Sequence, residues 1–215
     1  MGLPLVFLHG FLGTRRDWDE VISYLPRLKC IALDLPGHGE APFTETFEFT
    51  PPAPKFHLIG YSMGGRLAMR YALQYPERIA TLILASTHPG LRSQKERDER
   101  IAHDAKWAKR LACDDFFSAW YAQPLFAGFR PHTARSQNRE ALAKALLHYS
   151  LGRQPLLHVQ KALHVVGEKD EKFRALHPKA VVIEGAGHMV HLEKPKEFAK
   201  IIETHTIQPF LERLL

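Results

Sequence analysis

The sequence lacks any apolar run of the roughly 20 residues that a membrane-spanning helix needs. Its first segment, MGLPLVFLHGFLG, has no basic region before the apolar residues, so we expect no secretory signal peptide. There are only two cysteines, Cys30 and Cys113, and neither lies in a CxxC pattern. This scarcity argues against a disulfide framework or a zinc site. Together these absences predict reduced thiols and a cytoplasmic protein without membrane insertion.

A block of basic residues is also missing, although the formal net charge is +6 and the pI is about 9.4. The densest charged stretch, RSQKERDER (92–100), alternates in sign, which is typical of a solvated helix face. This pattern argues against a nucleic-acid partner and leaves an anionic small molecule as the expected one. No metal, nucleotide or flavin motif is present, so we expect neither a metal nor a cofactor.

What the sequence does contain is a regular alternation of short apolar runs and helical patterns. Runs of this kind are typical of strands buried on both faces of a parallel sheet. Helical periodicity follows several of them, over 14–25, 63–76 and 193–215. The alternation predicts one α/β domain over residues 1–215, with a mostly parallel sheet flanked by helices. The six expected strands lie within 3–10, 28–37, 55–62, 79–86, 162–170 and 179–188.

Two stretches interrupt this alternation. Residues 37–54 contain Pro51, Pro52 and Pro54, which exclude a helix of useful length before the next strand. Residues 88–155 show helical periodicity without a convincing strand. We interpret this second stretch, called the cap segment below, as a helical cap inserted over one edge of the sheet.

The segment GYSMG (60–64) fits the pattern G-x-S-x-G. The pattern alone is weak, because glycine and serine are common. Here a buried strand precedes it and a helix follows at once, which is the context of a nucleophile elbow. Such a turn would present the Ser62 hydroxyl at the carboxyl edge of the sheet, whereas the alternative is a glycine-rich turn without chemistry.

A serine hydroxyl needs a neighbouring base, and in folds of this kind the acid and the histidine follow later in the chain. Asp170 comes just after a predicted strand, and His188 lies in the turn GAGH after the last one. The predicted triad is therefore Ser62, His188 as proton acceptor and Asp170 as the carboxylate that orients the imidazole. The neighbouring alternatives are His191 for the histidine and Glu168 or Glu171 for the carboxylate.

An anion formed at this site also needs hydrogen-bond donors. The backbone amide of Met63 begins a helix, where negative charge is favoured. The amide of Phe11, after the first strand and the turn FLHGF, is the expected second donor. His9 and the turn DLPGHG (34–39), with Asp34 and His38, are expected to shape loops.

These residues resemble a known family. VFLHGF, ALDLPGHG, GYSMGG and GAGH together resemble the α/β-hydrolase superfamily. A narrower resemblance, which covers nearly the whole chain, is to the 2-succinyl-6-hydroxy-2,4-cyclohexadiene-1-carboxylate synthases, the MenH enzymes of menaquinone biosynthesis. It lies in ILASTHPGL (83–91), KWAKRL (106–111), FFSAWYAQPLFA (116–127), GEKDEKFRAL (167–176) and GAGHMVHLEKP (185–195).

The resemblance implies a lyase reaction, in which the triad abstracts a proton from a succinyl-enolpyruvyl substrate and pyruvate is eliminated. Because that substrate carries several carboxylates, guanidinium groups should line its pocket. By resemblance the substrate-binding residues are Tyr61, Arg66, Arg100, Trp120, Tyr121 and Arg135. An exposed helix position is the alternative for each arginine, and a place in the core of the cap is the alternative for Trp120 and Tyr121.

The chain departs from the family over residues 40–54, where a helical crossover is usual and prolines stand instead. We expect an irregular connection here that leaves apolar sheet surface exposed, which a second subunit could cover as a homo-oligomer. The alternative functions are a carboxylesterase or thioesterase acting through an acyl-serine and a non-catalytic binding protein of the same fold.

Overall fold

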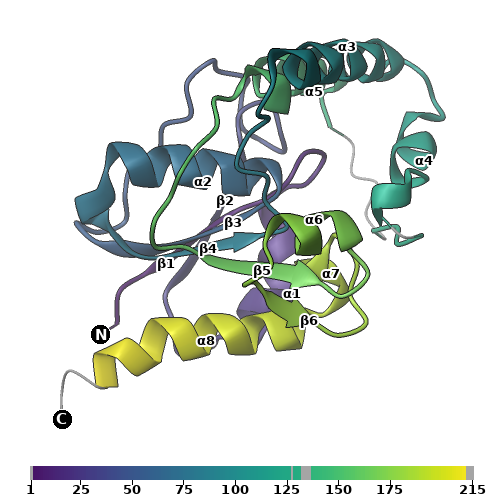
Figure 1. The fold of residues 1–215 in the computed structure, drawn as a ribbon. Coiled ribbons are helices and arrows are strands. Elements are labelled where there is room, and N and C mark those ends of the chain that lie inside the picture. Colours follow the sequence, from purple (N-terminus) through teal and green to yellow (C-terminus); the bar gives the residue numbers. More distant parts are fainter. Residues whose placement is uncertain (1, 127, 132–136, 212–215) are drawn as a thin grey trace.

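Six strands form one sheet at the centre of the protein (Figure 1). The computed structural model describes residues 2–126, 128–131 and 137–211, without the side chains of 207–211. The strands lie in the order β2-β1-β3-β4-β5-β6, and each neighbouring pair is parallel. Every strand predicted from the apolar runs is confirmed, in a shorter form. The strands are β1 (Leu5–Leu8), β2 (Cys30–Leu33), β3 (Phe56–Tyr61), β4 (Ile79–Ala85), β5 (Leu163–Gly167) and β6 (Val181–Ile183).

Helices occupy most of the connections. They are α1 (Asp19–Ser23), α2 (Met63–Gln74), α3 (Gln94–Arg110), α4 (Phe116–Tyr121), α5 (Arg139–His148), α6 (Glu171–Leu176), α7 (Val190–Glu193) and α8 (Pro195–Leu211). The helix predicted over 14–25 is shorter, because its first turn is a 3₁₀ turn that leads into α1. The helix predicted over 193–215 begins at Pro195, because a proline forces the preceding residue out of the helical region. Lys194 accordingly has φ −141° and ψ 60°.

The two faces of the sheet bury different side chains, because successive residues of a strand point to opposite sides. On β1, Leu5 and Phe7 belong to one apolar cluster, and Val6 and Leu8 belong to the other. Helix α2 covers the face of Val6, and α1 and α8 cover the opposite face (Figure 1). Burial on both faces explains why the strands are continuous apolar runs in the sequence. No described helix combines the length and apolar content that crossing a bilayer requires.

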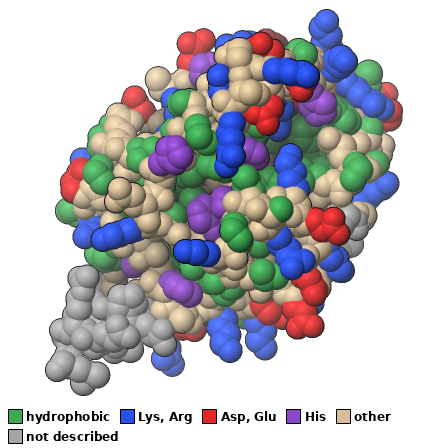
Figure 2. All heavy atoms as spheres, in the orientation of Figure 1, with side chains coloured by type: hydrophobic (Ala, Val, Ile, Leu, Met, Phe, Trp, Pro, Cys, Tyr) green, Lys and Arg blue, Asp and Glu red, His purple; other side chains and the backbone are tan. Residues whose placement is uncertain are grey.

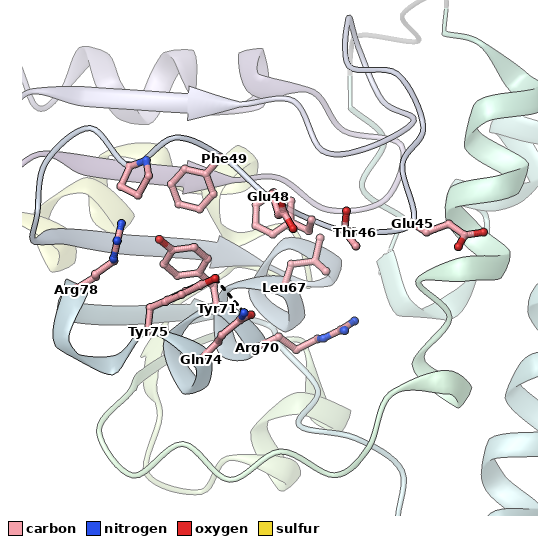
Figure 3. Close-up of a pocket in the computed structure, with 12 residues that line it drawn as sticks. Glu45, Thr46, Glu48, Phe49, Leu67, Arg70, Tyr71, Gln74, Tyr75 and Arg78 are labelled. Atoms are coloured by element: carbon pink, nitrogen blue, oxygen red, sulfur yellow. Dashed lines mark hydrogen bonds between the residues drawn. The ribbon is translucent and has the colours of Figure 1, made fainter.

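The connection between β2 and β3 contains no helix, as the prolines predicted. Its extended chain runs beside α2, and the Phe49 ring packs 4.8 Å from the ring of Tyr71 (Figure 3). A groove of about 350 Å³ separates chain and helix, with Arg70 and Arg78 among the α2-side residues that line it. Aromatic side chains of the connection therefore do part of the covering that a crossover helix would do.

Strand β2 is half-buried along its whole length, unlike the fully buried β1 and β3 beside it. Ile31, which pairs with Val6, points to the α2 face but belongs to neither apolar cluster of the described residues. Some apolar surface at this edge is thus accessible, as expected. A second subunit over it stays a prediction.

The cap segment lies between β4 and β5, and its described residues form helices and no strand. Helices α3 and α5 pack against each other, and Figure 1 shows α3, α4 and α5 grouped apart from α1 and α8. Asn138 accepts a hydrogen bond from the amide of Ala141 and so caps α5, and Ser93 with Glu96 forms a capping box at the start of α3. Both helices therefore begin at signals that the sequence itself carries.

Candidate active site

The turn between β3 and α2 holds Ser62 in a strained backbone conformation. Its φ is 50° and its ψ is −110°, a region that residues with a side chain rarely occupy. The flanking glycines make room for the turn: a Cβ on Gly60 would lie 2.6 Å from the Cα of Gly65, and one on Gly64 would collide with the carbonyl of His9. Strain of this kind persists only where the surrounding packing enforces it, which points to a functional position.

His188 and Asp170 form a buried hydrogen-bonded pair. The Nδ1 atom of His188 lies 2.6 Å from Oδ2 of Asp170, and each side chain is 2% exposed. Asp170 follows β5 and His188 follows β6, so the ends of two neighbouring parallel strands bring them together. With its Nδ1–H donated to the carboxylate, the imidazole keeps the lone pair of Nε2 for a proton.

Ser62 and His188 line the same pocket, so the three residues of the predicted triad converge. No hydrogen bond joins the Ser62 hydroxyl to the imidazole in the described part of the chain. In enzymes of this kind that contact often tightens only with substrate bound.

The neighbouring alternatives are placed differently. His191 is fully buried between the rings of Trp18, at 4.5 Å, and Tyr61, at 4.3 Å. Neither of its ring nitrogens has a hydrogen-bond partner among the described residues, and burial lowers its pKa to about 3. Glu168 is exposed and accepts a hydrogen bond from the amide of Gly185. These contacts leave His191 and Glu168 in structural roles.

The buried His191 should make stability depend on pH. A histidine has a pKa near 6.5 when unfolded and here about 3 when folded, so the unfolded state binds the proton first. Stability therefore falls as the pH drops below 6.5, by up to about 1.4 kcal/mol per pH unit for this residue. We expect His191→Phe to flatten that slope in urea unfolding measured between pH 7 and pH 4.5. The exposed His158→Gln is the control, and an unchanged slope in His191→Phe would contradict the expectation.

The pocket around Ser62 and His188 has a volume of about 110 Å³. Its walls come from the ends of the strands and from the cap segment, and Figure 2 shows a hollow with hydrophobic side chains inside and Lys and Arg side chains around it. Arg135 lies outside the described residues. The other predicted residues that line the pocket are Phe11, Tyr61, Met63, Arg66, Arg100, Trp120 and Tyr121.

The aromatic residues predicted from the resemblance form a connected wall. The ring of Trp120 lies 5.0 Å from that of Phe11 and 5.0 Å from that of Trp107. The Tyr121 ring packs 5.1 Å from Phe126, which in turn lies 6.1 Å from the imidazole of His188. Trp120 is thus both a packed residue of the cap segment and part of the pocket lining.

The predicted anion donors, the amides of Phe11 and Met63, belong to residues of the pocket lining. Neither amide has a hydrogen-bond partner within the described residues. Met63 is the first residue of α2, so its N–H is among the amides that no carbonyl of the helix can satisfy. Two free N–H groups beside Ser62 could stabilise negative charge that forms there.

The two described arginines are held in defined orientations. Arg66 donates hydrogen bonds to the carbonyl of Tyr149, at 2.7 Å, and to Gln154, at 3.3 Å. Burial and the nearby Arg100 lower the pKa of Arg66 to about 9. Arg100 directs its Nε to both carboxylate oxygens of Asp104, at 2.8 and 2.9 Å, so its terminal NH₂ groups remain for another anion.

The pocket lining includes polar residues that were not predicted, among them Ser86, His88, Asp104 and Lys172. A signal existed for two of them. Asp104 stands four residues after Arg100, the spacing of an ion pair on a helix, and Lys172 stands two residues after Asp170. Ser86 and His88 gave no signal, because nothing in a strand-to-loop junction shows which way its side chains point.

His9, Asp34 and His38 shape loops, as expected. The Nε2 of His9 accepts a hydrogen bond from the amide of Leu35 at 2.9 Å, which ties the loop after β1 to the loop after β2. Asp34 accepts hydrogen bonds from the amides of Arg15 and Glu40.

Across residues 2–126, 128–131 and 137–211, no three His, Cys, Asp or Glu side chains converge in a way that could hold a metal ion.

The parallel sheet, the strained serine turn and the His–Asp pair define a class of protein that comparison identifies directly. The chain belongs to the alpha/beta hydrolase family, whose model matches residues 5–201. It is 39% identical to the 2-succinyl-6-hydroxy-2,4-cyclohexadiene-1-carboxylate synthase of Enterobacter sp. (strain 638), over 92% of this chain and 90% of that enzyme. The predicted fold and the narrower resemblance are both confirmed.

Solved structures agree with this assignment. The structure of MenH from S. aureus matches with a TM-score of 0.78 at 29% identity, over 93% of this chain and 91% of that one. A thermophilic esterase from Thermogutta terrifontis matches with a TM-score of 0.70 at 25% identity, over 95% of this chain and 89% of that one. Lyase and ester hydrolase therefore share this framework.

Proposed function

We propose that the protein eliminates pyruvate from 2-succinyl-5-enolpyruvyl-6-hydroxy-3-cyclohexene-1-carboxylate to give 2-succinyl-6-hydroxy-2,4-cyclohexadiene-1-carboxylate, a step of menaquinone biosynthesis. The names of the Enterobacter and S. aureus relatives support this reaction. The observation that carries it is the pairing of Ser62 and His188 with two oriented guanidinium groups in one pocket. Such a pocket suits a small substrate with several carboxylates, and simple ester hydrolysis needs no arginine pair.

The triad supplies the base. His188, held by Asp170, takes the proton of the Ser62 hydroxyl as that oxygen removes a proton from a carbon of the substrate. The electron pair left on carbon moves into the ring as the bond to the enolpyruvyl oxygen breaks. The leaving enolpyruvate gains a proton and becomes pyruvate. No acyl-serine forms in this sequence.

The amides of Phe11 and Met63 stabilise the enolate-like oxygen that develops during proton removal. Arg66 and Arg100 bind carboxylates of the substrate, with Tyr61, Trp120 and Tyr121 forming the wall around the ring. Arg135 is proposed as a third guanidinium from the same cap segment. Since pockets for substrates of this size usually exceed about 300 Å³, the pocket of about 110 Å³ must widen to hold the substrate.

The second candidate is an esterase or thioesterase that acts through an acyl-serine. The strained turn at Ser62 and the likeness to the Thermogutta esterase favour it. In that reaction the same two amides would hold a tetrahedral oxyanion.

The two candidates are separated by a coupled assay of pyruvate release from the enolpyruvyl substrate, run beside hydrolysis of p-nitrophenyl esters. We expect pyruvate to be released with a kcat/KM at least 100-fold above that for p-nitrophenyl acetate. Rapid ester cleavage without release of pyruvate would contradict the lyase and support the esterase. A cytoplasmic location and an anionic small-molecule substrate are part of the proposal.

A further inference from the structure

One wall of the pocket carries two polar side chains that the mechanism above leaves unused, Ser86 and Lys172. Ser86 follows β4 directly, and Lys172 lies in the first turn of α6, which follows β5. Strands β4 and β5 are neighbours, and the amide of Ser86 donates to the carbonyl of Val165 in β5 at 2.9 Å. The topology therefore places both residues at the same edge of the sheet as Ser62.

The Ser86 hydroxyl has no hydrogen-bond partner among the described residues, although the side chain is fully buried. Its φ is 43°, so Ser86, like Ser62, is a pocket-lining residue other than glycine that has a positive φ. The next residue, Thr87, uses its own hydroxyl on the carbonyl of Ala85. A buried hydroxyl without a partner costs about 1–3 kcal/mol, and a hydrogen bond from Ser86 to a bound group would remove that cost.

Lys172 is an exposed residue of the pocket lining, and its ammonium has no acidic partner of its own among the described residues. No carboxylate within the described residues forms an ion pair with it, whereas Asp104 is bound to Arg100. Partial burial of the ammonium and then the charge of Arg100 lower the pKa of Lys172, and the charge of Asp170 partly offsets this. His88 beside it stays neutral near pH 7, because burial and the charges of Lys172 and Arg100 lower its pKa to about 4.

The charges around this wall are therefore unbalanced. Arg66, Arg100 and Lys172 bring three positive charges, and the nearby carboxylates of Asp104 and Asp170 bring two negative ones. A carboxylate between the ammonium and the hydroxyl would restore balance and give Ser86 an acceptor. The Phe173 ring, 5.9 Å from the Lys172 ammonium and 4.8 Å from the His188 ring, links this position to the imidazole.

We propose that Ser86 and Lys172 form a carboxylate-binding subsite, distinct from Arg66 and Arg100, that holds one carboxylate of the substrate beside His188. The proposal rests on the function proposed above for its substrate, but the subsite itself requires only a small organic anion. Its role is to position the substrate, so its loss should weaken binding more than it slows the chemical step.

The test uses Lys172→Met with Lys169→Met as the matched control, because both lysines are exposed and Lys169, unlike Lys172, lies outside the pocket lining. In the pyruvate-release assay we expect KM to rise about 10- to 100-fold in Lys172→Met, the size of a lost hydrogen bond to a charged group, with kcat within about threefold. Lys172→Arg should recover part of the lost affinity, and Lys169→Met should match the wild type. An unchanged KM in Lys172→Met would overturn the proposal.

Ser86→Ala tests the hydroxyl separately and should raise KM about 5- to 20-fold without lowering the thermal midpoint, because the removed group has no partner in the fold. Binding of succinate, measured by calorimetry, separates the subsite from the reaction. Succinate affinity that falls in Lys172→Met but not in Lys169→Met supports the subsite even if no pyruvate is released. Pyruvate release with equal succinate affinity and equal KM in both variants would remove the subsite and leave the lyase.

Discussion

Ser62→Ala is expected to lower kcat for pyruvate release by about 100- to 10,000-fold, the range that positioned acid–base groups supply. The hydroxyl is the group closest to the substrate in the proposed proton transfer, and its turn is built around it: φ at Ser62 is 50°. The small side chain of alanine fits the same turn, so the loss should come from chemistry and not from folding. Steady-state kinetics with a thermal unfolding curve measures both.

The effect of Ser62→Ala should fall on kcat, because the substrate carboxylates still find Arg66 and Arg100. Ser23→Ala is the control, since Ser23 is exposed and bonds only to the carbonyl of Glu20 within its own helix. A Ser62→Ala enzyme that retains more than a tenth of the wild-type kcat would show that another group removes the proton. A fluorophosphonate that labels Ser62 would show a reactive serine without deciding between lyase and esterase.

Asp170→Asn is expected to reduce kcat by roughly 1,000- to 10,000-fold with little change in shape. Asp170 accepts a hydrogen bond from the Nδ1–H of His188 across 2.6 Å. An asparagine amide can donate to Nδ1 instead, and the ring proton would then move to Nε2, the atom that must accept the proton from Ser62. The imidazole would keep its position and lose its function as a base.

The matched control for Asp170→Asn is Asp98→Asn, because Asp98 is exposed on α3 and bonds only to Gln94. The control should keep wild-type kinetics. Structure determination or a thermal midpoint within a few degrees would confirm that Asp170→Asn is folded. Nearly full activity in a folded Asp170→Asn enzyme would contradict the assignment of the carboxylate.

The fold was predictable from sequence because strands that are buried on both faces of a sheet consist of continuous apolar runs. All six strands were found in this way, and their parallel order brings Asp170 and His188 to the edge where Ser62 lies. The first and last residues of the helices were harder to predict from sequence. The break before Pro195 follows from a local steric rule, whereas the 3₁₀ turn that precedes α1 depends on the burial of Trp18 in the core.

The cap segment was the harder part of the site. RSQKERDER reads as a solvated helix face, yet Arg100 at its end turns into the pocket and binds the buried Asp104. Which residue of a charged helix points inward depends on how that helix folds back over the sheet, and short-range periodicity does not encode this. The burial of Ser86 likewise depends on tertiary packing, which the local sequence does not encode.

The helix-free connection between β2 and β3 reaches the pocket through two hydrogen bonds. The carbonyl of Thr44 accepts from the hydroxyl of Tyr149 at 2.8 Å, and the carbonyl of Tyr149 accepts from Arg66 at 2.7 Å. This short connection thus helps to hold the Arg66 guanidinium, which we propose binds the substrate. A change in the length of this loop should therefore alter substrate affinity while the triad stays in place.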